Sequence, residues 1–169
     1  LPQQWRFCID PDNQGSEKNW ADPAFNDSAW RSLRVPGYWE SQGVNDANPA
    51  FPGSKHPYDG YAWYRCRVTI PKEYKGVPLA LALGPIDDYD ATYLNGHKIG
   101  QTGNQTPAAY ATPRDYTLAP DVIRYDQENV IAVKVYDGLN YGGILGPEVK
   151  IHFKRTDNYP YLDAKPSWN

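Results

Sequence analysis

Acidic residues gather in one short stretch of the chain, where they could serve as catalytic groups. Asp87, Asp88 and Asp90 follow one another closely. A glycosidase needs two carboxyl groups that face each other about 5 to 9 Å apart. Asp87 and Asp88 are adjacent, so in an extended chain their side chains point to opposite sides. The stretch therefore makes a poor catalytic pair.

Other patterns of catalytic residues are missing from the sequence. There is no Gly-x-Ser-x-Gly nucleophile motif. The three histidines, His56, His97 and His152, lack the spacing of metal ligands. We therefore expect a chain without catalytic activity of its own.

Aromatic residues with a polar tip are frequent, with 14 Tyr and 6 Trp against only 4 Phe. These side chains suit a carbohydrate ligand, because a pyranose can pack its apolar C–H face on an aromatic ring. Carboxylates, amides and guanidinium groups can bind its neighbouring hydroxyls in pairs. The alternative is that the tyrosines cover loops of the protein itself.

The two cysteines, Cys8 and Cys66, have no neighbouring ligands that would form a zinc or redox motif. Each lies in a predicted strand, so a disulfide between them is geometrically possible, and it would require an oxidising compartment. Two isolated, half-buried thiols are the alternative.

One turn imitates the start of a calcium-binding loop. Asp10 and Asp12 stand at its first and third positions and Gly15 at its sixth. The twelfth position, where an EF-hand has Glu, is Ala21, which argues against that motif.

The elements that must position these residues are short strands. Alternation of apolar and polar residues, bounded by Gly and Pro turns, predicts nine of them. They cover residues 5–9, 32–35, 62–70, 77–83, 90–94, 97–100, 114–118, 130–136 and 149–153. The Asn95-Gly96 pair is a strong hairpin signal. We predict an all-β fold, a β-sandwich of eight to nine antiparallel strands.

Strand direction predicts where a binding site would lie. If consecutive strands are antiparallel, the long connections 38–62, 84–89, 101–113 and 137–147 meet at one end of the sandwich, here called the loop end. Binding residues gather on long loops held by a rigid scaffold. The candidate ligand-binding residues at this end are Trp39, Glu40, Tyr58, Asp59, Tyr61, Asp87, Asp88, Tyr89, Tyr110, Arg114, Asp137, Asn140 and Tyr141.

Composition limits the class of partner. The formal net charge of −3 argues against a nucleic-acid partner, which requires a basic face. No apolar run has the roughly 18 to 20 residues of a membrane span. The chain starts at Leu1, which we interpret as a processed or excised piece. We expect the sandwich to cover residues 1–155 and residues 156–169 to form a linker or C-terminal arm.

Eight motifs in order carry a resemblance to a known family. They are Trp5-x-Phe7-x-x-Asp10, Phe25-x-Asp27-Ser28-x-Trp30, Val35-Pro36-Gly37-x-Trp39-Glu40-x-x-Gly43, Gly60-x-Ala62-Trp63-Tyr64-Arg65, Leu83-Gly84-x-Ile86-Asp87-Asp88-x-Asp90, Leu94-Asn95-Gly96-x-x-Ile99-Gly100, Arg114-x-Tyr116 and Asn129-x-Ile131-Ala132-Val133. The series resembles the N-terminal sugar-binding domain of family 2 glycoside hydrolases, a jelly-roll sandwich of the galactose-binding-like fold. The resemblance spans residues 5 to 153.

The resemblance implies a non-catalytic carbohydrate-binding module attached to a secreted or periplasmic polysaccharide-degrading enzyme of a bacterium. A structural domain that packs on the catalytic domain without binding sugar is the alternative, and a third is that its loops complete a partner's active site. No cofactor is required. The fold often carries a structural calcium, for which Asp10, Asp12, Asp87, Asp88 and Asp137 are the candidate ligands.

Overall fold

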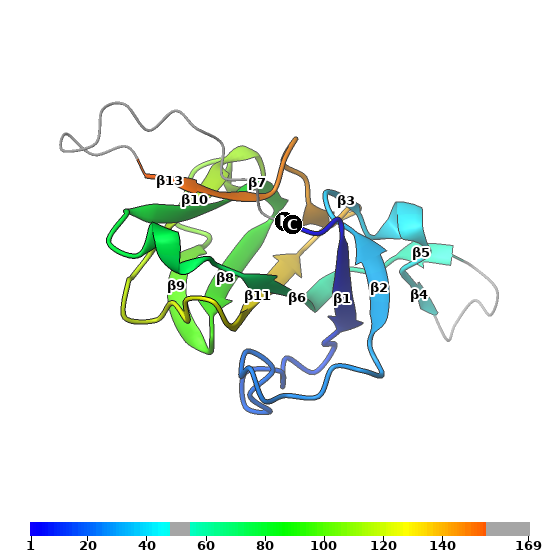
Figure 1. The fold of residues 1–169 in the computed structure, drawn as a ribbon. Helices are drawn as coiled ribbons and strands as arrows, with labels where there is room; N and C mark the ends of the chain where they lie inside the picture. The colour runs from blue at the N-terminus through cyan, green and yellow to red at the C-terminus, as the bar shows by residue number, and fades with distance from the viewer. Residues whose placement is uncertain (48–54, 155–169) are drawn as a thin grey trace.

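A computed structural model describes residues 1–47 and 55–154 of the chain. Within these residues the chain forms thirteen strands, three short 3-10 helices and no α-helix. A six-stranded and a five-stranded antiparallel sheet pack against each other, and a small two-stranded ribbon lies beside them (Figure 1). The expected all-β sandwich is confirmed.

The six-stranded sheet holds most of the long strands. Its spatial order is β2 (Arg31–Arg34), β1 (Gln4–Ile9), β6 (Gly60–Thr69), β11 (Glu128–Asp137), β8 (Tyr89–Leu94) and β9 (His97–Thr102). The turn between β8 and β9 is Asn95-Gly96, with φ angles of 51° and 83°. Two positive φ angles are what a two-residue type I′ turn requires, and this pair of residue types adopts them readily. The hairpin predicted there is confirmed.

The second sheet is built around β7. Its strands are β10 (Pro113–Leu118), β7 (Leu79–Asp87), β12 (Gly143–Ile144) and β3 (Gly37–Tyr38), and β13 (Lys150–Phe153) also pairs with β7. The ribbon consists of β4 (Asn45–Ala47) and β5 (Lys55–Pro57), and the 3-10 helices are η1 (Glu40–Gln42), η2 (Lys72–Tyr74) and η3 (Ala109–Ala111).

All nine predicted strands are present, but four further strands were not expected. These are β3, β4, β5 and β12, each of two or three residues. Segments this short cannot show a period-two pattern, so the expected number of eight to nine strands was too low.

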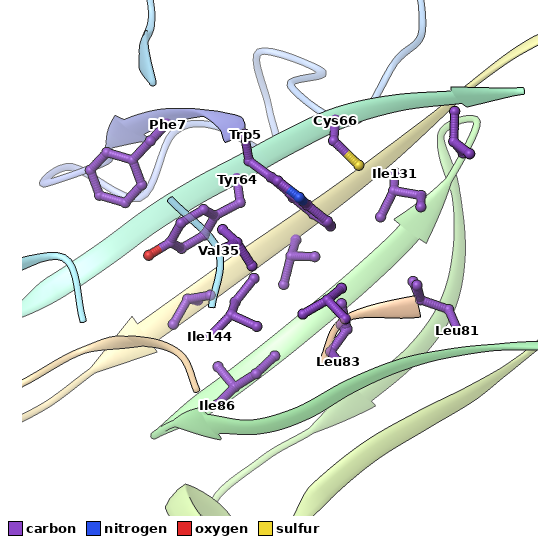
Figure 2. Close-up of a cluster of buried hydrophobic side chains, with 14 of the residues drawn as sticks. Trp5, Phe7, Val35, Tyr64, Cys66, Leu81, Leu83, Ile86, Ile131 and Ile144 are labelled. Carbon is purple, nitrogen blue, oxygen red and sulfur yellow. The ribbon is translucent and has the colours of Figure 1, made fainter. Parts of the chain in front are cut away.

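The core lies between the two sheets (Figure 2). Trp5, Phe7 and Tyr64 come from the six-stranded sheet and are at most 1% exposed. Leu81 and Leu83 of β7 face them from the other sheet and are fully buried, as their alternate spacing predicts. These aromatic residues therefore pack in the core.

A loop segment, residues 10–30, covers part of the outer face of the six-stranded sheet. Trp20 and Trp30 pack edge to face, with ring centroids 5.0 Å apart, and Trp20 also contacts Trp63 of β6. Beneath them the buried Arg65 donates from Nε to Asp27 at 2.8 Å and donates further to backbone carbonyls of the segment. Arg65 is therefore a structural ion-pair partner.

The calcium-like turn at the start of this segment has no free ligand at its first position. Asp10 accepts hydrogen bonds from the backbone N–H groups of Gln14 and Gly15 and from Trp63 Nε1, at 2.8 to 3.0 Å. Both oxygens of Asp10 therefore already accept hydrogen bonds from the protein itself.

The last described strand ends at Phe153, close to the boundary expected at residue 155. Residues 156–169, predicted to be a linker or arm, lie outside the described part of the chain. The helical turns in the described part have three residues each, too few to cross a membrane.

Cys8 and Cys66 do not form the disulfide that the sequence allowed; both cysteines are free, as in the alternative of two isolated thiols. Their strands, β1 and β6, are neighbours, but Cys8 lies opposite Trp63 in the register rather than opposite Cys66. Cys66 packs into the core between the sheets, whereas Cys8 packs with the outer cluster around Trp63. The two side chains therefore point to opposite faces of the sheet, which no rotamer change can bridge.

Thiol titration tests this arrangement. Without any reductant, the denatured chain should react with two equivalents of Ellman's reagent. The native chain should react with at most one, because Cys66 is buried and burial raises the pKa of its thiol. A Cys66→Ala variant should keep the native reactivity of the wild type. Finding no titratable thiol in the unreduced, denatured chain would show that the two cysteines form a disulfide.

Candidate functional site

The predicted loop end exists, and carboxylates hold it together. The connection from β11 to β12 passes over it, and backbone N–H groups of this connection donate to acidic side chains of other segments. Gly138 N–H donates to Asp88 at 3.0 Å, Asn140 N–H to Asp59 at 3.1 Å, and Gly142 N–H to Glu40 at 3.2 Å. Three of the candidate ligand-binding carboxylates therefore already bind the protein's own backbone.

A fourth carboxylate, Asp137, lies deeper. It is fully buried, and its Oδ1 accepts a hydrogen bond of 3.3 Å from Leu139 N–H. Its Oδ2 has no partner in the described structure. Carboxylate oxygens of Asp87, Asp88 and Asp137 lie within 4.8 Å of one another. The loop end therefore holds a concentrated and incompletely paired negative charge, here called the carboxylate cluster.

Burial and crowding raise the pKa values of the carboxyl groups at the loop end. Burial, followed by the neighbouring Asp88, raises the pKa of Asp87 to about 7. Burial also raises the pKa of Asp137 to about 6, and Asp59 and Asp88 add to that rise. For Glu40, burial and then the charge of Asp137 raise the pKa to about 7, against three hydrogen bonds that favour its ionised form. Near neutral pH these groups can both donate and accept hydrogen bonds.

Oxygen-rich clusters of this kind suit a hard cation. Calcium takes six to eight oxygen ligands, and carboxylates are its usual protein ligands. Of the five candidate calcium ligands, Asp87, Asp88 and Asp137 are brought together. The unpartnered Oδ2 of Asp137 is the atom that such an ion would satisfy.

Arg114, expected to contact ligand at the edge of the site, is buried instead. Its side chain is 0% exposed, and Nε donates to Asp90 Oδ1 at 2.9 Å. Its Nη2 donates to the backbone carbonyl of Asp88 at 2.7 Å, and Nη1 donates to the carbonyls of Ala109 and Thr112. The guanidinium therefore positions the cluster and η3, and the prediction that it binds a ligand directly is contradicted.

Two of the predicted stacking residues are core residues. Trp39 is 0% and Tyr58 is 4% exposed, and their ring centroids are 6.0 Å apart. Trp39 Nε1 donates to the Tyr58 carbonyl, and the Tyr58 hydroxyl donates to the Tyr61 carbonyl. No sugar can stack on rings so buried, and this part of the predicted site is contradicted.

Other aromatic rings are exposed at the loop end. Tyr141, which was expected there, is 56% exposed, and Tyr110 on η3 is 57% exposed. Tyr38, which was not expected, is 42% exposed and its ring lies 5.6 Å from that of Tyr141. Tyr38 lies in the two-residue strand β3, which is too short to show an alternating pattern, so the sequence did not mark it.

Tyr61 and Tyr89 lie elsewhere. They are half-buried on the outer face of the six-stranded sheet, where both rings contact Tyr136 of β11. The prediction missed Tyr136. Tyr61, Tyr136 and Tyr89 stand opposite one another in the strand register, which only the pairing of three strands reveals.

Comparison with known proteins identifies the family of this chain. Residues 15–138 match the model of the family described as the beta-galactosidase second all-beta domain. The chain belongs to this family. The resemblance stated from the sequence is thus confirmed at the level of β domains of these glycoside hydrolases, although the family model does not describe the N-terminal sugar-binding domain specifically.

The relatives that match this second all-beta domain are much longer proteins, and the match covers only a small part of each. The chain is 28% identical over 132 residues to beta-galactosidase BoGH2A of Bacteroides ovatus and 24% identical over 145 residues to a beta-galactosidase of Vibrio cholerae. These matches cover 78% and 80% of this chain but only 14% and 13% of the relatives.

Solved structures show the same fold. A calcium binding mutant of Bacteroides uniformis beta-glucuronidase 2 superposes with a TM-score of 0.68 at 23% identity, over 89% of this chain and 17% of that one. A beta-glucuronidase of Ruminococcus gnavus in complex with D-glucuronic acid gives a TM-score of 0.65 at 20% identity, over 85% and 27% of the two chains.

The buried pair of Arg114 and Asp90 should control the stability of this second all-beta domain. Arg114→Met should lower the free energy of unfolding by about 3 to 5 kcal/mol, because it leaves a buried carboxylate without its partner. Asp90→Asn combined with Arg114→Met should cost less than the sum of the two single changes. Chemical denaturation of the four proteins measures this, and additive costs would show that the pair is not coupled.

Glu40 should make stability depend on pH. Its folded-state pKa of about 7 lies above the ordinary value near 4.3, so the folded state retains a proton that the unfolded state loses. The contribution of this group is complete below about pH 4 and is lost as the pH rises to about 7. Relative to wild type, Glu40→Gln should therefore gain about 1 to 2 kcal/mol of unfolding free energy between pH 4.5 and 7.5, less than the full shift implies because water reaches part of the carboxyl.

The matched control is Glu17→Gln, which removes an exposed carboxyl outside the loop end. Its unfolding free energy relative to wild type should stay level across the same pH range. A level difference for Glu40→Gln as well would contradict the raised pKa.

Proposed function

We propose that the chain is a non-catalytic domain of a larger glycoside hydrolase and that its loop end binds carbohydrate. The family and the coverage of its relatives support the first part, since a match to 13 or 14% of a beta-galactosidase is a match to one domain. The observation that carries the second part is the carboxylate cluster, in which Asp137 Oδ2 is buried without a partner beside a connection that carries exposed Tyr141.

The chemistry of the cluster suits sugar hydroxyls. A hydroxyl donates one hydrogen bond and accepts others, and carboxyl groups with pKa values between about 6 and 7 can do both near neutral pH. The exposed rings of Tyr38 and Tyr141 offer apolar faces for the C–H groups of a pyranose. A small site of this kind would bind weakly, and the attached domains would raise the affinity for a polymer.

Catalysis by the cluster itself is a weaker interpretation. Its carboxyl oxygens lie within 4.8 Å of one another, closer than the about 5 to 9 Å that separates the two carboxyl groups of a glycosidase. Asp137 is fully buried, and Asp87 and Asp88 are neighbours in the chain. The hydrolytic groups would therefore belong to the attached catalytic domain.

A calcium ion is a second candidate occupant of the cluster. Asp87, Asp88 and Asp137 would hold it through carboxylate oxygens, and the ion would neutralise their charge and could bind sugar hydroxyls. The extracytoplasmic location expected from the resemblance also stays a proposal. A disulfide would have supported this location, but the two cysteines are free and do not require an oxidising compartment.

Calorimetric titration with oligosaccharides tests the proposed function, and each titration is run with millimolar CaCl₂ and again with EDTA. Tyr141→Ala should weaken binding by about 5- to 150-fold, the equivalent of about 1 to 3 kcal/mol for one stacked ring, without lowering the melting temperature. Asp137→Asn should weaken it as well, because it changes the unpartnered acceptor.

Trp39→Ala is the control for packing. It should lower the unfolding free energy by about 3 to 5 kcal/mol, as loss of a buried aromatic does. Equal loss of melting temperature in Tyr141→Ala and Trp39→Ala would show that Tyr141 is a packing residue and favour a purely structural domain. Binding or stabilisation that appears only with calcium, and disappears in Asp137→Asn, would assign the cluster to the ion.

A further inference from the structure

The outer face of the six-stranded sheet is covered over only part of its area. Residues 10–30 place Trp20, Phe25 and Trp30 over one region, where they pack with Trp63 and Tyr93. The strand residues nearer the loop end lie beyond this cover. They are Tyr61 of β6, Lys134 and Tyr136 of β11, and Tyr89 and Ala91 of β8, all half-buried.

Three tyrosines form a continuous aromatic row across this uncovered region. Tyr61 and Tyr89 stand opposite Tyr136 on its two sides, with ring centroids 4.8 Å and 5.9 Å from it. The rings of Tyr89 and Tyr136 are nearly parallel, at 6°. Strand pairing therefore sets the row rigidly on three adjacent strands, as a preorganised aromatic surface.

The row borders a hollow of about 400 Å³. This volume falls within the range of small-molecule sites in proteins, about 300 to 1,000 Å³. Residues 101–104, at the end of β9 and just after it, form the opposite side. Among them, Gln101 and Asn104 are exposed. The Gln101 amide oxygen accepts from Lys98 Nζ at 2.8 Å, which leaves its NH₂ group and the Asn104 amide for a ligand's hydroxyl groups.

The hollow differs from the loop end in charge. Asp90 and Lys134 are the lining residues that carry a charge at neutral pH, and the carboxylate of Asp90 is buried and paired with Arg114. The Lys134 ammonium lies 4.7 Å from the centre of the Tyr61 ring and donates to the neutral Ser16 Oγ at 3.4 Å. No carboxylate of the described residues forms an ion pair with it. Burial lowers its pKa, with Asp10 acting in the opposite direction, so the ammonium is partly desolvated. The hollow thus presents an aromatic surface beside an incompletely compensated cation.

We propose that this hollow binds an acidic sugar, a pyranose that carries a carboxylate. The C–H face of the sugar packs on the rings of Tyr89 and Tyr136, and its carboxylate pairs with the Lys134 ammonium. The amides of Gln101 and Asn104 bind its hydroxyls. This site is separate from the carboxylate cluster, where crowded negative charge would repel the same ligand.

Nuclear magnetic resonance titration of the 169-residue chain tests the proposal with two matched probes. Methyl β-D-glucuronide and methyl β-D-glucoside differ at C6, where one has a carboxylate and the other a hydroxymethyl group. The glucuronide should shift the backbone amide signals of β8, β11 and residues 101–104. The glucoside should bind about tenfold more weakly, the difference expected for one charge-assisted contact.

Variants separate the contributions. Lys134→Met should abolish the preference for the glucuronide, whereas Lys75→Met, which removes an exposed ammonium in the turn after η2, should keep it. Tyr89→Ser should weaken binding of both sugars. Asp137→Asn should leave the glucuronide affinity unchanged, which distinguishes this site from the one proposed at the loop end.

Three outcomes would overturn the proposal, and the first two need only the wild-type chain. One is equal affinity for the two sugars, and another is a set of shifts confined to residues 137–143 or an absence of shifts. The third is an equal loss of preference in Lys134→Met and Lys75→Met, which would show a general effect of net charge.

Discussion

The buried ion pair between Arg114 and Asp90 is the interaction on which the geometry of the loop end depends. Both side chains are 0% exposed, and they come from opposite sheets, Arg114 from β10 and Asp90 from β8. Two charges are tolerated in an interior only when they pair and their remaining donors and acceptors are satisfied. Here Tyr116 and Thr92 complete the shell of Asp90, and backbone carbonyls complete that of Arg114. One of those carbonyls belongs to Asp88, so the pair also positions the point where the chain passes from one sheet to the other.

The acidic residues of the loop end fall into two groups according to their hydrogen bonds. Glu40, Asp59 and Asp88 accept hydrogen bonds from the connection between β11 and β12 and so hold it in place. Asp137 stands at the start of the same connection, buried and with one oxygen unpartnered. Three carboxylates of the loop end therefore bind the protein's own backbone, and Asp137 and Asp87 remain for a ligand.

The two proposed sites carry opposite charges, although strand β11 contributes to both. Asp137 ends the strand at the carboxylate cluster, and Lys134 and Tyr136 lie three residues and one residue before it on the outer face of the sheet. A neutral sugar suits the first site because its hydroxyls donate to carboxylates, and an acidic sugar suits the second because an ammonium faces it. One strand can serve both because its side chains alternate between faces and its end opens onto the loops.

The sequence by itself determined the strands of four or more residues and the end of the sandwich at which the long loops meet. Period-two patterns are local, and the Asn95-Gly96 turn depends on two residues alone, so neither needs a partner to be recognised. Alternating strand direction then placed the carboxylates of Asp87, Asp88 and Asp137 together, as the structure does. Each of these inferences needs only the order of the residues and strands along the chain.

Only the tertiary structure decided which of those residues face solvent and which face one another. The alternation along one strand does not say how neighbouring strands are aligned, so it could not show that Cys8 and Cys66 point to opposite faces. Nor could it show that Trp39 is covered by the core while Tyr141 is exposed, because burial depends on what packs above a residue. The same limit concealed the hollow beside Lys134, which exists because three paired strands set their tyrosines side by side and residues 10–30 leave that region of the sheet uncovered.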